Sequence, residues 1–154
     1  MRKAAFLFLM LAIHFPGLAQ QPKGLGFVFL EPAGLSLKVW FPRGGALQAA
    51  AGWSSHRGRP FQVQADWQFF QRGLDLSALS ELRLYAGAGA RLAFASDIRA
   101  AVRLPLGLDF LSRSVPLNFF LEFVPLVILN PKVSTDLRAA LGVRYLFDGS
   151  SPRR

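Results

Sequence analysis

The residues best suited to hydrolytic chemistry lie together at one point of the sequence. His56 directly follows Ser54 and Ser55, and the only other histidine is His14. A hydrolytic site also needs a group that orients its base, and no carboxylate stands at a recognisable spacing from His56. The chain has no cysteine, and its carboxylates show no metal-ligand spacing. We therefore predict no catalytic residues, no metal and no cofactor, so the protein is not expected to be an enzyme.

Charged residues inside otherwise apolar stretches are more informative. Counting along these stretches places Arg103, Glu122 and Arg144 at a similar depth. We expect these three to form a structural charge cluster, because a buried charge without a partner is costly. The same face carries seven cations and three carboxylates: Lys38, Arg83, Arg91, Arg99, Arg103, Arg138 and Arg144, against Asp66, Asp109 and Glu122. Four cations are therefore expected to lack a strand-borne partner.

Three of these arginines, Arg91, Arg99 and Arg138, are expected at one common end of the structure. Arg57 and Arg59 stand in a connection at that end. A guanidinium matches phosphate geometry well, so the three are candidates for contact with an anionic group such as a lipid phosphate. The alternative is that they are only solvated.

The elements that carry these residues are expected to be β-strands. In 82–94 and 98–110 every even position is apolar, while the odd positions are mixed. Similar alternation marks 24–30, 35–41, 47–53, 61–69, 117–123 and 137–147. Alternation over about ten residues, repeated an even number of times, is typical of outer-membrane barrels. The sequence therefore predicts an all-β fold, a closed antiparallel up-and-down transmembrane β-barrel of eight strands, with residues 20–147 as its one domain.

Pro105 and Pro125 fall inside predicted strands. Proline cannot donate a ladder hydrogen bond, and a closed barrel has no free edge on which to place it. We expect bulges at these positions, or a seventh strand that is broken near Pro125.

Composition separates a membrane barrel from a soluble one. Hydrophobic residues make up 52% of the chain and charged residues 18%, below the roughly 25% of a soluble domain. The mixed face is largely Gly, Ala, Gln and Ser, which suits a narrow lumen better than a solvated surface. A soluble periplasmic barrel or sandwich, with its apolar face turned inward, is the lesser alternative.

The chain begins with the layout of an export signal. Arg2 and Lys3 precede the apolar stretch 4–15, and small residues end at Ala19. The stretch is shorter than the roughly 20 residues of a spanning helix. We predict a signal peptide over 1–19, and export argues against nucleic acid as a partner despite the net charge of +9.

The final strand ends in the run Gly142, Val143, Arg144, Tyr145, Leu146 and Phe147. This run resembles the carboxy-terminal assembly signal of small bacterial outer-membrane β-barrel proteins, whose last strand is recognised by the barrel-assembly machinery. The resemblance implies an outer-membrane location with lipid and that machinery as partners, and we expect a monomer. A short polar tail, 148–154, follows Phe147, whereas family chains commonly end on the aromatic residue.

Two function classes follow. The first is a structural or surface-binding barrel with a filled lumen. The alternative is a narrow pore or a carrier of a small apolar ligand, which needs a continuous cavity. Bulky residues assigned to the interior favour the first class: Trp40, Phe70, Tyr85, Phe120, Leu126 and Leu146.

Overall fold

The computed structural model describes residues 21–42, 44–54, 58, 60–70, 74–77, 80–112 and 114–147. The predicted signal peptide and the tail 148–154 lie outside this part of the chain. Within it, no helix is long and apolar enough to cross a membrane. The described residues form ten β-strands: β1 (Lys23–Leu30), β2 (Ala33–Trp40), β3 (Gly45–Trp53), β4 (Phe61–Phe70), β5 (Leu74–Ser77), β6 (Ser80–Phe94), β7 (Ile98–Arg103), β8 (Leu106–Ser112), β9 (Leu117–Ile128) and β10 (Ser134–Phe147).

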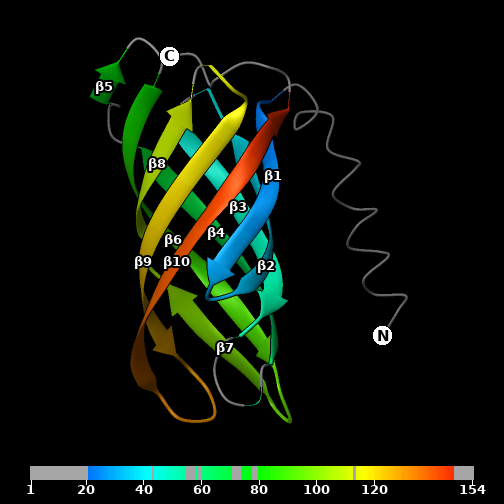
Figure 1. Ribbon diagram of the computed structural model, residues 1–154. Coiled ribbons are helices and arrows are strands. Elements are labelled where there is room, and N and C mark those ends of the chain that lie inside the picture. Colours follow the sequence, from blue (N-terminus) through cyan, green and yellow to red (C-terminus); the bar gives the residue numbers. More distant parts are fainter. Residues whose placement is uncertain are drawn as a thin grey trace.

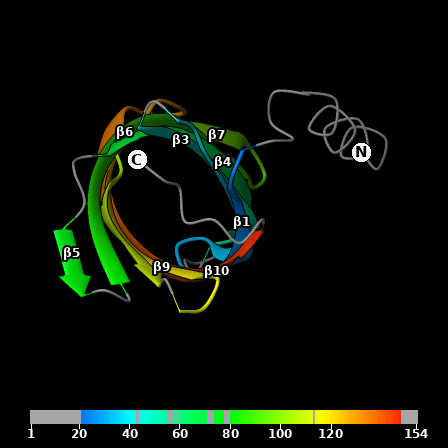
Figure 2. The same cartoon turned by 90° about the horizontal axis from the view of Figure 1, so that it is seen from above.

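Antiparallel pairing between neighbours closes these strands into a barrel. Around the ring, β1, β2, β3, β4 and β6 are successive neighbours. β6 pairs with both β7 and β8, and these two pair with β9. β9 pairs with β10, and β10 pairs back with β1. The ring is visible from above in Figure 2, and Figure 1 shows that the strands tilt strongly against the barrel axis, as closure requires. The predicted closed, eight-stranded, antiparallel up-and-down barrel is therefore confirmed.

Ten strands make an eight-stranded barrel because two of the barrel's strands are interrupted. β7 and β8 form one of them, since both pair with β6 and with β9 in the same register. β5 continues along β6 where β4 ends at Phe70.

The two prolines are accommodated without a change of register, so the expectation of bulges is wrong. The interruption falls at Leu104 and Pro105, whereas β9 runs through Pro125 unbroken. Both prolines still accept a ladder bond: Gly87 N donates to Pro105 O at 2.8 Å, and Leu104 N donates to Pro125 O at 3.0 Å. Each proline therefore costs the ladder one donor and leaves the strand in line.

The two faces of the barrel wall are chemically opposite. Apart from Lys23 at the start of β1, no outward position of β1–β4 or β6–β10 carries a charge. Large apolar side chains are exposed there, as at Phe27 (56%), Leu35 (54%) and Phe123 (54%). The buried inward positions instead hold most of the polar and charged side chains: Ser36, Lys38, Gln48, Gln62, Gln64, Asp66, Gln68, Arg91, Arg103, Asp109, Asn118, Glu122 and Arg144.

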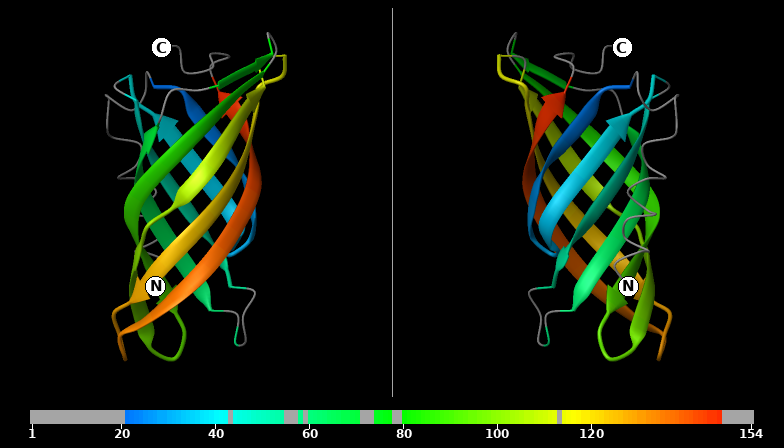
Figure 3. Two further views of the ribbon diagram at one scale, coloured as in Figure 1. Left: turned by 90° about the vertical axis from the view of Figure 1, so that its left-hand side faces the viewer. Right: turned by 90° about the vertical axis from the view of Figure 1, so that its right-hand side faces the viewer.

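The two ends of the barrel also differ. Lys23 and Phe147 pair at one end, which we call the terminal end, and the connections after β1, β3, β6 and β9 lie at the far end. The β1–β2 hairpin is short, so β10 extends past it between Ser134 and Ala139 (Figures 1 and 3). Glu31 in that hairpin is buried, which brings a carboxylate from a connection into the interior.

Candidate functional site: the charged barrel interior

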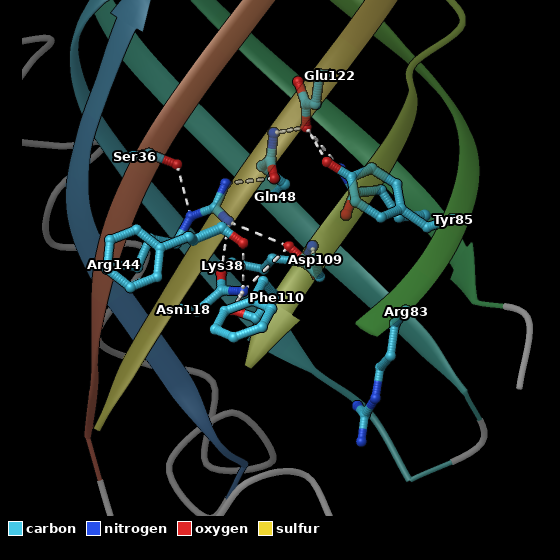
Figure 4. A network of polar contacts seen from close by, with 12 residues as sticks. Ser36, Lys38, Gln48, Arg83, Tyr85, Asp109, Phe110, Asn118, Glu122 and Arg144 are labelled. Atoms are coloured by element: carbon cyan, nitrogen blue, oxygen red, sulfur yellow. Dashed lines mark hydrogen bonds and ion pairs between the residues drawn. The ribbon is translucent and has the colours of Figure 1, made fainter. Parts of the chain in front are cut away.

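Glu122 on β9 accepts hydrogen bonds from side chains of three other strands. Its Oε1 receives Gln48 Nε2 at 2.7 Å, Tyr85 OH at 2.7 Å and Gln68 Nε2 at 3.3 Å. Its Oε2 lies 3.5 Å from Arg103 Nη2. Figure 4 shows Gln48 and Tyr85 both pointing toward this carboxylate. Glu122 thereby ties together walls of the barrel that share no ladder.

Arg103 also binds a second carboxylate. Its Nε lies 2.9 Å from Asp66 Oδ1, and its Nη1 donates to Gln64. Asp66, Gly89 and Arg103 are successive partners across β4, β6 and β7. A Cβ at Gly89 would overlap the Asp66 carboxylate. The glycine therefore makes room for an ion pair that crosses β6.

Arg144 lies among neutral groups as well as charged ones. Its three guanidinium nitrogens donate to Ser36 Oγ at 2.9 Å, Asn118 Oδ1 at 3.0 Å and Gln48 Oε1 at 2.6 Å. The guanidinium carbon stacks 3.6 Å from the centre of the Phe120 ring. All three donor directions are thus satisfied inside a fully buried site.

The structure brings two members of the expected charge cluster together directly. Arg103 faces Glu122, but Arg144 reaches Glu122 only through Gln48, which accepts from the arginine and donates to the carboxylate. In the β9–β10 ladder Glu122 lies opposite Ala140, so Arg144 is displaced along the tilted strand. Counting residues from strand ends does not account for this displacement.

A second buried ion pair, which the sequence interpretation missed, lies towards the terminal end. Lys38 Nζ is 2.5 Å from Asp109 Oδ2, and both side chains are fully buried. Asn118 Nδ2 donates to Asp109 Oδ1 at 3.2 Å, and Arg144 Nη1 lies 3.8 Å from the same oxygen. Both charges had been assigned to the interior, but β2 and β8 are not neighbours, so their meeting could not be inferred from strand order. The ammonium also lies 4.3–5.5 Å from three ring centroids: Tyr85, Phe70 and Trp40.

Apolar side chains fill the interior beyond this pair. We call this cluster the terminal plug; it consists of the buried Trp40, Ala46, Leu111 and Leu146, with Phe70 packed against them. Its members belong to strands from around the barrel, so it spans the interior. Trp40, Phe70 and Leu146 were among the bulky residues assigned inward.

The far end carries a separate polar group centred on Arg138. Arg138 Nη1 lies 2.7 Å from Glu31 Oε1, and Arg138 Nε lies 2.6 Å from Asp136 Oδ2. Gln62 Nε2 donates to Glu31 Oε1 at 2.8 Å. Of the three arginines expected at this end, Arg138 is therefore ion-paired.

Arg91 and Arg99 differ from Arg138. Arg91 is 7% exposed, and it makes no hydrogen bond or ion pair with any residue that the structure describes. Arg99, on the neighbouring strand β7, is exposed and likewise has no polar partner among the described residues. The cations with the largest electrostatic effect on Arg91 are Arg138 and Arg103.

The expectation of four interior cations without a strand-borne partner is wrong, because β6 and β10 begin before Glu81 and Asp136 and so carry two further carboxylates. Glu31, in the β1–β2 hairpin, adds a third. Glu31 and Asp136 pair with Arg138, and Glu81 pairs with Arg83 at 2.7 Å. Figure 4 shows Arg83 pointing away from the central network. Glu81 and Asp136 each stand two residues before their arginine, a spacing that puts both on one face of a strand. That spacing is the signal by which the sequence could have revealed them.

The remaining candidates are less informative. Ser54 is buried, while Ser55, His56, Arg57 and Arg59 lie outside the described residues. In the described part of the chain, no group of three or more histidine, cysteine, aspartate or glutamate side chains could hold a metal ion.

Comparisons with known proteins found no similarity to this chain: no family model matches it, and neither a curated protein nor a solved structure does. The function must therefore be argued from the barrel itself.

Proposed function

We propose that this protein is a small outer-membrane β-barrel with a structural or surface-binding role. The observation that carries the proposal is the inversion of the wall: the outward face is apolar around the whole circumference, and the charges are inside. A soluble barrel has the opposite arrangement, and exposed apolar patches beyond a few hundred Å² are rare on soluble monomers. Lipid is the environment that such a surface fits.

Aromatic side chains lie in contact near both ends of the outward face. Near the far end, Trp53, Phe61 and Phe94 form a row with ring centroids 5.4 and 6.3 Å apart. Near the terminal end, Trp67 contacts Phe69, and Tyr145 contacts Phe147. Two aromatic belts separated by an aliphatic band are typical of barrels that cross an outer membrane.

The interior supports a filled barrel over a pore or a ligand carrier. The terminal plug and the buried pair of Lys38 and Asp109 occupy one end, and the network around Glu122 occupies the middle. An eight-stranded barrel is only just wide enough for such side chains. The signal-like residues 1–19 and the final aromatic strand favour the same location.

A pair of leucine substitutions tests the membrane location. Leu121 is an exposed outward residue of β9, whereas Leu129 is exposed in the connection after β9. Leu121→Arg should reduce the stability of the barrel in lipid vesicles by about 2–4 kcal/mol, and Leu129→Arg by about 0–1 kcal/mol. Urea unfolding in vesicles, followed by the gel mobility of the folded barrel, measures both. Equal effects, together with a native chain that stays folded in buffer without detergent, would refute the proposal.

A further inference from the structure

We propose that Arg91 is the core of an anion site inside the far end of the barrel, and that the site takes a phosphate group. Arg91 is the described interior cation that combines deep burial with the absence of any hydrogen-bond or ion-pair partner. Its Nε is a buried donor without an acceptor. A buried charge of this kind is costly unless something compensates it.

The neighbouring protein groups do not supply the compensation. Arg91 lies between Gln64 on β4 and Ala101 on β7 in the two ladders. The carbonyl oxygen of the Gln64 side chain already accepts from Arg103. The other neighbour, Ala101, offers no polar side chain. Arg91 is thus held inward by its strand, with its donors uncommitted.

When Arg91 itself is counted, three cations share two carboxylates here, and both carboxylates already have other partners. Four charged groups have the largest electrostatic effect on Arg91: Arg138, Glu31, Arg103 and Asp136. Both carboxylates among them are bound by Arg138, and Glu31 also accepts from Gln62. Arg103 in turn is paired with Asp66. The position in front of Arg91 therefore favours an added anion.

Phosphate fits the donors and the route of entry. A guanidinium presents parallel N–H groups that match two oxygens of a phosphate. The terminal plug fills the opposite end, so entry is from the far end, where the exposed Arg99 provides a second cation near the rim. The phosphate can come from free phosphate ions or from the headgroup of an anionic lipid; only the lipid source depends on the proposed membrane location.

The test compares the stability of the full chain in detergent with and without inorganic phosphate, at an ionic strength held constant with chloride. Ligand that binds only the folded state raises its stability. The unfolding midpoint of the native barrel should rise with phosphate, and Arg91→Gln should weaken the fitted phosphate affinity at least about tenfold. Arg83→Gln, at the terminal end, is the matched control and should keep the native response.

Two further arms complete the design. Arg91→Lys keeps the charge but not the pair of parallel N–H groups, so phosphate should stabilise it less than the native chain. This variant still tests the site if Arg91→Gln folds poorly. In vesicles of phosphatidylcholine with or without phosphatidic acid, a lipid source predicts stabilisation by phosphatidic acid that Arg91→Gln abolishes. The site is assigned to free phosphate if two results hold together. Phosphatidic acid changes the stability of the native chain and of Arg91→Gln equally, and phosphate still stabilises the native chain in detergent. A phosphate response that is absent, or unchanged by Arg91→Gln, overturns the proposal.

Discussion

Glu122 and Arg103 are enclosed by the barrel, and each contacts more than one group that complements it. Glu122 accepts hydrogen bonds from three neutral donors and pairs with one cation. Arg103 pairs with two carboxylates and donates to a side-chain amide. Such sharing means that the loss of one member leaves several others unsatisfied. Substitutions in the interior are therefore expected to have effects larger than a single hydrogen bond.

The first prediction concerns Glu122→Leu. The change removes the acceptor of three hydrogen bonds and one of the two carboxylates that pair with Arg103, so the barrel should lose about 3–5 kcal/mol of stability. The urea concentration at which the folded gel band disappears measures this loss. Glu81→Leu removes a carboxylate from a partly exposed pair and should cost only about 0–1 kcal/mol. Similar midpoints for the two variants would show that Glu122 does not hold the network together.

The second prediction concerns the pair formed by Lys38 and Asp109. Either Lys38→Met or Asp109→Leu alone leaves a buried charge with fewer partners, and each should destabilise by about 3–5 kcal/mol. The double variant should lose less than the sum of the two, because neither charge of the pair is left behind. Unfolding midpoints of the four proteins give this coupling. If the double variant loses as much stability as the two single variants together, the contact between Lys38 and Asp109 contributes no coupling energy.

At the scale of elements, alternation was sufficient to predict which face of each strand turns inward. Lys38, Asp66, Asp109 and Glu122 all lie inside as predicted from their parity, and the eight barrel strands follow the predicted segments. This works because successive side chains of a strand point to opposite sides, whatever the strand pairs with.

The strand ends and the contacts across the lumen could not be predicted in the same way. Glu81 and Asp136 were assigned to connections, although β6 and β10 begin before them. The meeting of Lys38 with Asp109 depends on how far the strands are staggered around the closed ring. That stagger is a property of the whole ring and leaves no local pattern in the sequence.

The third prediction concerns Pro125, which lacks the N–H that would donate to the Leu104 carbonyl. Pro125→Val restores this donor at an exposed position of β9, so stability should rise by about 0.5–1.5 kcal/mol. Pro116→Val, in the connection before β9, is the control and should bring no gain. Hydrogen exchange checks the cause, because the new amide at position 125 should exchange slowly. Fast exchange there, or equal gains in both variants, would contradict this account of the ladder.

At the scale of the whole molecule, the interior has three layers between its ends. The terminal plug lies at one end, the network of Glu122 and Arg103 occupies the middle, and the group around Arg138 lies at the far end. The charged layers bind strands that are not neighbours, so they brace the ring across its diameter. A continuous water path has to cross all three layers.

The fourth prediction follows from this filling. Purified protein inserted in a planar bilayer should give no steady single-channel conductance, because the terminal plug and the charged network leave no open passage. A porin of known conductance, prepared in the same detergent, is the positive control. Discrete, reproducible current steps from this chain would favour the alternative of a narrow pore.

The difference between the two ends also gives the barrel a direction. The terminal plug closes one end, so the proposed phosphate site at Arg91 would exchange with one compartment only. Its occupancy would follow the phosphate concentration on the far side and be independent of the other side. Reconstituted in a single orientation, the protein would respond to phosphate added to one face of a bilayer and remain silent to the other.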